Sequence, residues 1–186
     1  MTNTARMLLI LGPVVFGFAM SLTTPIVNLY FMRLVDAQVY AFVGVMYTAI
    51  AAVMQSVMSN ERLRAKIRRW FSLIIVFDVI AFTAVSYGST ESVTLRFIGI
   101  SALAATSVSL WSTIMMDAVN AVINGSKLTT FQSTSHAYCL WANLAGGLLS
   151  IALIDAISIE LAMGVQCLAN GICATTDYTA FKKITA

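Results

Sequence analysis

The chain has 186 residues, of which 59% are hydrophobic and only 10% are charged, and its formal net charge is +3. An ordinary soluble domain carries roughly 25% charged residues, so the composition excludes that class and predicts one compact membrane-embedded domain, residues 1–186. The positive charge does not indicate nucleic acid, because the basic residues lie in short segments beside long apolar runs. A lipid bilayer is the expected partner.

Six apolar stretches are each close to the ~20 residues that a transmembrane helix requires. We therefore expect an all-α integral membrane protein with six transmembrane helices. The predicted spans are residues 7–30, 37–58, 71–88, 93–115, 133–154 and 156–174.

The basic residues divide unevenly between the segments that connect these spans. Nine of the eleven Lys and Arg residues fall on one side, and only Arg33 and Arg96 fall on the other. Five of the nine lie in the loop expected at residues 60–70. Because short loops rich in Lys and Arg are retained in the cytoplasm, we expect a protein of the plasma (inner) membrane with both termini cytoplasmic.

The outer third of the first span contains Pro25 and, three residues later, Asn28. Proline inside a helix removes a backbone hydrogen bond, so we expect Pro25 to kink the span and to free a carbonyl near Ser21. A kinked, polar outer segment suits a gate or a cavity wall, and it equally suits a bend that packing alone requires. Both explanations remain open.

Two of the spans repeat a small residue every four positions. The rows are Gly44, Thr48 and Ala52 in the second span, and Ser101, Ala105, Ser109 and Thr113 in the fourth. Small residues let helix backbones approach closely in lipid, so both rows are predicted to mark faces that pack inside the protein.

Asp78 is the strongest single candidate for a functional residue. It lies roughly 12 Å along the helix from Trp70, which places it near the middle of the third span. An ionised Asp at that depth costs at least ~2.5 kcal/mol, so it must be neutral, paired or in a wet cavity. A functional carboxyl is one explanation. A protonated carboxyl that is merely bonded to a hydroxyl from the Ser and Thr row is the other.

Two charged residues are predicted near the outer boundary of the membrane. Arg96 opens the fourth span, and Glu160 lies a turn inside the sixth. Their similar depth is compatible with an outer ion pair that latches the helices together. Arg96 alone is also compatible with a side chain that extends to the lipid headgroups.

Asn143, near the middle of the fifth span, is a second candidate for a cavity residue. No hydrolase, zinc-protease, redox, nucleotide-binding or dinucleotide-binding motif occurs in the chain, and its carboxylates are scattered over different spans. We therefore expect neither an enzyme nor a cofactor nor a bound metal.

The overall organisation resembles one six-helix half of a major facilitator superfamily transporter. That family has a basic loop signature between its second and third helices, and Glu61, Arg62 and Lys66 align with the acidic and basic positions of that signature. Val57 and Arg64 stand where the family has glycines. The resemblance implies a small-solute carrier in which two copies complete one cavity, since the family has two six-helix halves related by an axis along the membrane normal.

Within this interpretation, Asp78 and Asn143 line the cavity, and Asp78 couples proton movement to solute movement. The alternative is a membrane subunit of a larger complex. One version resembles the substrate-binding membrane subunits of energy-coupling-factor importers, and another is a purely structural subunit. The sequence does not identify the solute or the partner subunits.

Overall fold

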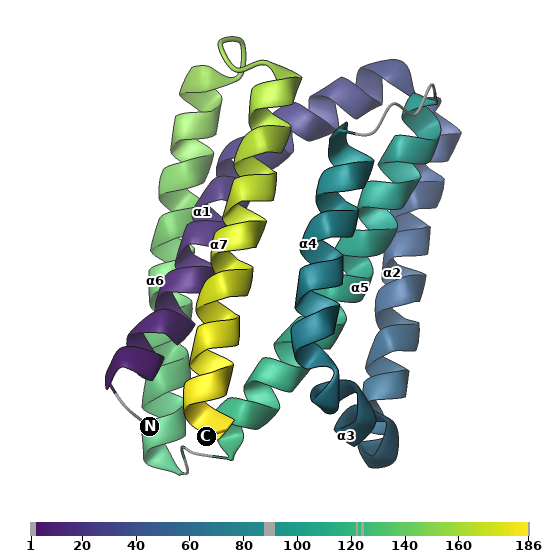
Figure 1. Ribbon diagram of the computed structural model, residues 1–186. Helices are drawn as coiled ribbons and strands as arrows, with labels where there is room; N and C mark the ends of the chain where they lie inside the picture. The colour runs from purple at the N-terminus through teal and green to yellow at the C-terminus, as the bar shows by residue number, and fades with distance from the viewer. Residues whose placement is uncertain (1–2, 88–91, 122, 124, 186) are drawn as a thin grey trace. The chain divides into compact units, whose positions relative to one another are not determined.

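The computed structural model describes residues 3–87, 92–121, 123 and 125–185 (Figure 1). Within these residues the secondary structure is entirely helical, as the sequence predicts. The helices are α1 (Asn3–Leu34), α2 (Ala37–Ser59), α3 (Glu61–Arg69), α4 (Phe71–Tyr87), α5 (Val93–Asn120), α6 (Ser126–Leu153) and α7 (Ile159–Thr185). The predicted end of the third span, residue 88, lies outside the described residues.

Most of these helices have the length and composition of membrane spans. Helices α1, α2, α5 and α6 are each long and apolar enough to cross a bilayer. Helices α3 and α4 together make a fifth candidate, with a bend of 72° between them. These helices indicate a membrane protein, and the described residues contain four or five candidate spans rather than the six predicted.

The chain divides into two units. Unit 1 consists of Met1–Leu29 and Met115–Ala186, and unit 2 consists of Tyr30–Ile114. Unit 1 therefore holds most of α1 together with α6 and α7, and unit 2 holds α2, α3, α4 and most of α5.

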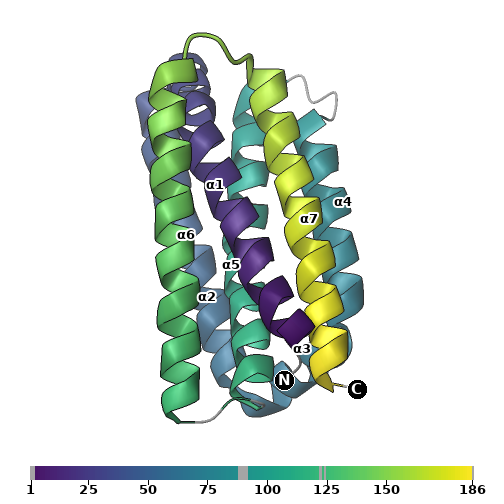
Figure 2. The same cartoon turned by 90° about the vertical axis from the view of Figure 1, so that its left-hand side faces the viewer.

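In unit 1, α1 lies between α6 and α7 (Figure 2). Gly146 of α6 touches the α1 backbone, because a Cβ at that position would lie 2.4 Å from the Phe18 carbonyl oxygen. Gly12 of α1 faces α7, where a Cβ would lie 2.3 Å from the side-chain hydroxyl of Thr176, whereas the nearest α7 backbone atom, the Cys173 Cα, would be 3.5 Å away. The absence of a side chain at these two glycines lets the helices pack at short distance.

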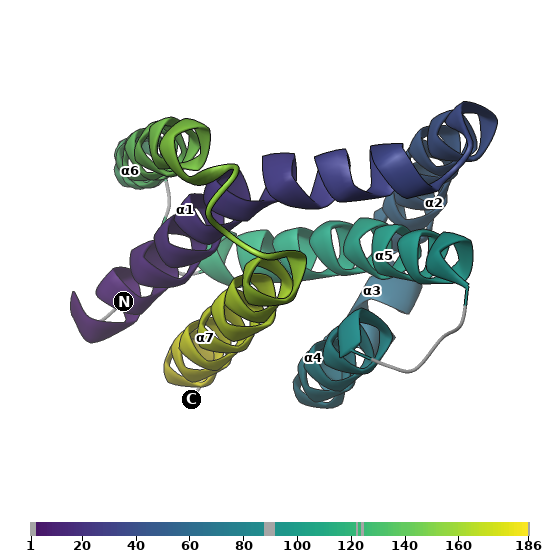
Figure 3. The same ribbon diagram turned by 90° about the horizontal axis from the view of Figure 1, so that it is seen from above.

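In unit 2, α5 lies between α2 and α4 (Figure 3). Phe97 of α5 stacks on Tyr40 of α2 with ring centroids 5.4 Å apart, and on Phe31 with centroids 4.6 Å apart. On the other side of α5, a Cβ at Gly99 would lie 2.9 Å from a methyl group of Val85 in α4. Aromatic stacking thus packs α2 against α5, and a small-residue contact packs α4 against its other side.

Polar side chains set the boundaries of the helices around the basic segment. The Asp36 carboxylate accepts a hydrogen bond from the Gln38 amide at 2.8 Å and caps α2. Asn60 ends α2 and begins α3, with its side-chain oxygen accepting from the amides of Arg62 and Leu63 at 3.1 and 3.3 Å. The basic segment is therefore a helix, and its prediction as a loop was wrong.

Several helices extend beyond the predicted spans, and the extension is largest in α6 and α7. Helix α6 begins at Ser126 rather than residue 133, and α7 continues to Thr185 rather than ending at residue 174. Hydropathy locates the apolar part of a helix, whereas backbone hydrogen bonds continue through polar residues at its ends. The helices are therefore longer than the predicted spans at these points, and the membrane boundaries themselves stay predictions.

The two rows of small residues have different surroundings. In α5, Ala105 and Ser109 are buried, as predicted. In α2, Gly44, Thr48 and Ala52 are all exposed, so within this chain they do not form an interior face. Small residues permit a close approach between helices, but neighbouring helices decide which face is used, and the buried residues of α2 are Val43 and Met58.

Candidate functional site

Asp78 lies on the packing face of α4. It is the eighth of the 17 residues of this helix, and its side chain is 8% exposed. The other buried residues of α4 are spaced at helical intervals from it: Phe71, Ile75, Phe82 and Ser86. The helical period therefore turns the one carboxyl group of α4 towards the interior together with its aromatic and aliphatic neighbours.

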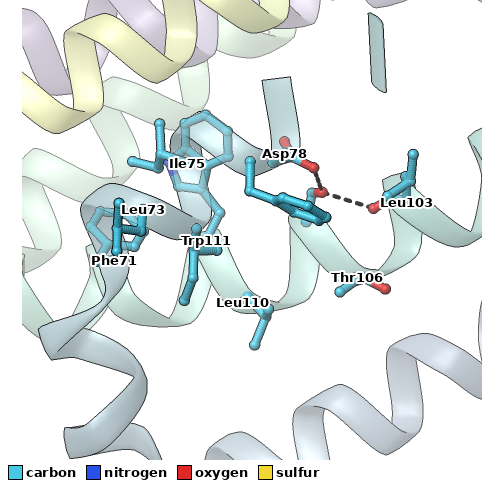
Figure 4. A pocket seen from close by; sticks show the side chains of 11 residues that line it. Phe71, Leu73, Ile75, Asp78, Leu103, Thr106, Leu110 and Trp111 are labelled. Atoms are coloured by element: carbon cyan, nitrogen blue, oxygen red, sulfur yellow. Dashed lines mark hydrogen bonds between the residues drawn. The ribbon is translucent and has the colours of Figure 1, made fainter. Parts of the chain in front are cut away.

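The Asp78 carboxyl is hydrogen bonded to Ser107 of the adjacent helix α5 (Figure 4). The same Ser107 hydroxyl lies 2.8 Å from the carbonyl oxygen of Leu103, one turn earlier in α5. A serine hydroxyl has a single hydrogen to donate and can also accept. When Asp78 is ionised, Ser107 can donate to the carboxylate; when Asp78 is protonated, the carboxyl can donate to Ser107, which then donates to Leu103.

The hydroxyl therefore serves both protonation states of Asp78, and only the position of one hydrogen has to change between them. Ser107 does not belong to the row of small residues from which the sequence predicted such a hydroxyl. It lies two positions before Ser109, on a different side of α5.

Asp78 and Ser107 line a crevice between α4 and α5 with a volume of about 390 Å³. Its walls are mainly apolar, and three of the side chains that form them are aromatic: Phe71, Phe77 and Trp111 (Figure 4). Phe77 is 70% exposed, so the crevice opens at the surface of unit 2. The indole nitrogen of Trp111 is buried and has no hydrogen-bond partner among the described residues.

Asn143 belongs to unit 1 and lies against α1. A Cβ at Gly17 would be 2.5 Å from the Asn143 side-chain oxygen, so the amide occupies the space that this glycine leaves. Asn28 and Pro25 are half-buried in the same unit, on a part of α1 that stays helical through the proline. Because Asn143 and Asp78 belong to different units, the shared cavity stays a prediction.

The remaining predicted residues are at helix ends or on α3. Arg96 is in the first turn of α5 in unit 2, and Glu160 is exposed in the first turn of α7 in unit 1, so their pairing also stays a prediction. Glu61, Arg62 and Lys66 are exposed on α3, whereas Asp78 lies in the middle of the next helix, α4.

The sequence interpretation missed a polar row on α7. Gln166, Asn170 and Asp177 are between 5% and 8% exposed, and the Cys173 thiol lies 3.7 Å from an Asp177 carboxylate oxygen and donates to it. Their spacing of four, three and four residues places them on one helix face. The signal was present, but the sixth span was ended at residue 174, which separated Asp177 from the row.

Within the described part of the chain, no group of three or more His, Cys, Asp and Glu side chains could hold a metal ion. The chemistry of the candidate site is therefore that of one buried carboxyl, one hydroxyl and an apolar crevice. Comparisons of the chain with protein-family models, with curated proteins and with solved structures give no match.

Proposed function

We propose that the chain is a half-size secondary transporter of a small solute, in which Asp78 binds and releases the coupling proton. The observation that carries the proposal is the Asp78–Ser107 pair in the crevice between α4 and α5. A carboxyl in the middle of a membrane helix is expensive when ionised, and residues of this kind commonly belong to proton relays. Ser107 lowers the free-energy difference between the ionised and the protonated form of Asp78, because its hydroxyl can hydrogen bond to both forms.

The transporter proposal includes six spans, with α7 as the sixth. Helix α7 is less apolar than α1, α2, α5 and α6, because it carries Glu160 and the polar row. However, α7 buries Gln166 and Asn170 and exposes Leu161 and Leu168, which are 57% and 66% exposed. A helix with polar residues inside and leucines outside suits a lipid environment. Six spans would place both termini on the same side of the plasma membrane, and the distribution of basic residues favours the cytoplasmic side.

The proposal also includes a homodimer, in agreement with the resemblance to half of a major facilitator transporter. The exposed row on α2 supports it. The Thr48 hydroxyl donates to the Gly44 carbonyl at 3.1 Å, and the Ser56 hydroxyl donates to the Ala52 carbonyl at 2.9 Å. The row, which Ser56 continues by one turn, is therefore made of small residues whose hydroxyls already donate within α2, so a second α2 could pack closely on it.

The first test asks whether Asp78 binds a proton in the folded protein. Trp111 lines the same crevice, so its fluorescence should report the charge of Asp78 once Trp70 and Trp141 are replaced by Phe. We expect a fluorescence titration with pH that is lost in Asp78→Asn and kept in Asp155→Asn, which removes an exposed carboxylate.

The second test measures transport in proteoliposomes with a panel of radiolabelled neutral and singly charged solutes. For a transported solute, Asp78→Asn should abolish accumulation driven by a pH gradient and keep exchange at equal concentrations. Accumulation that is unchanged in Asp78→Asn would exclude proton coupling at this residue.

The alternative is a membrane subunit of a larger complex, for example the substrate-binding component of a multi-subunit importer. The same exposed row on α2 favours it, because the surface could bind a different subunit instead of a second copy. Native mass spectrometry of gently extracted protein separates the two. A species near twice 20.1 kDa supports the homodimer, and a species with an unrelated chain supports the subunit.

A further inference from the structure

Helix α3 differs from every neighbouring helix in its charge. Five of its nine residues are Lys or Arg, and Glu61 is its one acidic residue. Arg62, Lys66 and Arg69 are exposed and follow one another at intervals of four and three residues, so they share one side of the helix.

The apolar residues of α3 and its C-cap form a second stripe. Leu63, Ile67 and Trp70 have the same intervals, displaced by one residue, which rotates the stripe by about 100° around the axis. Leu63 is 42% exposed and Trp70 is 62% exposed, so this apolar stripe is not covered by the rest of the chain. Adjacent basic and apolar stripes are typical of helices that lie at a membrane surface.

The orientation of α3 agrees with this chemistry. Its axis is bent by 72° from that of α4, and Asn60 caps it as a separate helix instead of an extension of α2. Where α4 crosses the bilayer, a helix at this angle lies close to the membrane plane. Trp70, at the junction, then lies at the depth that tryptophan favours, between headgroups and hydrocarbon.

We propose that α3 is a binding surface for anionic phospholipid headgroups. Leu63, Ile67 and Trp70 enter the boundary of the acyl chains, and Arg62, Lys66 and Arg69 contact lipid phosphates beside them. The complementarity of charge selects the occupant, since the surface carries a large excess of positive charge. The inference depends on the membrane assignment of α2 and α4, and not on proton transport by Asp78.

The test uses the full chain reconstituted in vesicles, with Trp111→Phe and Trp141→Phe so that Trp70 is the remaining tryptophan. Brominated phosphatidylglycerol and brominated phosphatidylcholine quench a tryptophan that they touch. We expect phosphatidylglycerol to associate with the site at Trp70 about fivefold more strongly than phosphatidylcholine does. The attraction of a single basic residue to an anionic surface already corresponds to a factor of about this size. Raising the salt concentration from about 0.1 to 1 M shortens the Debye length from about 10 to 3 Å, so it should reduce the preference for phosphatidylglycerol.

A triple variant, Arg62→Gln with Lys66→Gln and Arg69→Gln, should bring the preference close to one. The matched control removes three exposed positive charges elsewhere, in Lys127→Gln with Lys182→Gln and Lys183→Gln, and should keep it. If the triple variant does not fold, Arg62→Lys with Arg69→Lys should keep both the fold and the preference, and the salt series on the parent decides.

Equal quenching by the two lipids in the parent protein overturns the proposal, because α3 then touches lipid without a preference for anionic headgroups. Equal loss of preference in the triple variant and in the control also overturns it, because net charge alone then explains the effect. Quenching at Trp70 by neither lipid also overturns the proposal, because the apolar stripe of α3 then does not touch the membrane.

Discussion

Gly146 and Gly147 are neighbours in α6 with opposite surroundings. A Cβ at Gly146 would lie 2.4 Å from the Phe18 carbonyl oxygen and 3.1 Å from the Leu22 amide nitrogen, both backbone atoms of α1. A Cβ at Gly147 would meet nothing within 4 Å. Backbone atoms of a packed helix cannot move aside as a flexible side chain can. The same added methyl group should therefore clash at Gly146 and be tolerated at Gly147.

We predict that Gly146→Ala lowers the free energy of unfolding by about 1–3 kcal/mol, the usual cost of overpacking a well-packed contact. Gly147→Ala should be neutral or stabilising by up to about 1 kcal/mol, because alanine favours the helix. Unfolding of the purified protein in mixed detergent micelles measures both. Similar stabilities for the two variants would show that α1 and α6 do not pack at Gly146.

Asp78 shows how one residue acquires its surroundings from two helices. Helix α4 contributes the carboxyl, and α5 contributes the hydroxyl of Ser107, 29 positions later in the chain. A lone Asp in an apolar span indicates a buried polar contact, but the identity of the partner depends on the rotation of α5 about its axis.

At the scale of single elements, α3 depends on Asn60 for its start. The Asn60 side chain accepts hydrogen bonds from two backbone amides that have no partner within the helix. We predict that Asn60→Ala destabilises α3 by about 1 kcal/mol and accelerates amide hydrogen exchange at Arg62 and Leu63.

The conservative variant Asn60→Asp keeps the acceptor and adds a negative charge at the helix N-terminus, so it should keep the slow exchange. Ser59→Ala is the matched control, since the Ser59 hydroxyl donates to Ser56 within α2. Fast exchange in Asn60→Asp would show that the side chain does not act as a cap.

Helix α7 is the element whose membrane role the hydropathy leaves open. If α7 spans the membrane, Asp155 before it and Lys183 near its end lie on opposite sides. We predict that Asp155→Cys and Lys183→Cys, each in a chain whose Cys139, Cys167 and Cys173 are replaced by Ala, react with a membrane-impermeant maleimide from opposite sides.

Thr4→Cys provides the control in the same background, because six spans place it on the same side as Lys183. Both residues are exposed, so accessibility within the protein does not limit the reaction. Labelling of Asp155→Cys and Lys183→Cys from one side would reduce the number of spans to five.

At the scale of the whole molecule, the exposed row on α2 determines whether two copies associate. A Cβ at Gly44 would meet nothing within 4 Å in the chain itself, so a larger side chain there should leave folding intact. We predict that Gly44→Leu weakens the homodimer at least tenfold, because the leucine keeps the two α2 backbones apart.

Energy transfer between labelled copies diluted in vesicles measures the dimer. Gly147→Leu is the matched control, as it adds the same side chain on α6 at a position that is equally open. An undiminished dimer in Gly44→Leu would remove α2 from the interface, and a dimer lost in both variants would indicate a general effect of the added leucine.

The sequence alone determined that the chain is helical and suited to a membrane, because both properties follow from composition and from runs of apolar residues about as long as a bilayer is thick. It also indicated a buried polar contact at Asp78, since a carboxyl in an apolar run is visible without a structure, whereas the function of this residue stays a prediction. Helix ends were less accessible: α7 continues through Lys182 and Lys183 because backbone hydrogen bonding does not stop where hydropathy falls.

Only the tertiary structure decided which faces meet. The row at Gly44, Thr48 and Ala52 has the same pattern as the row at Ala105 and Ser109, yet the first is exposed and the second contains buried residues. Likewise, the partner of Asp78 is Ser107 and not a residue of that row. The pattern of a helix is local, whereas its burial depends on neighbours that are distant in sequence, and this is the physical reason why the contacts of the candidate site required the fold.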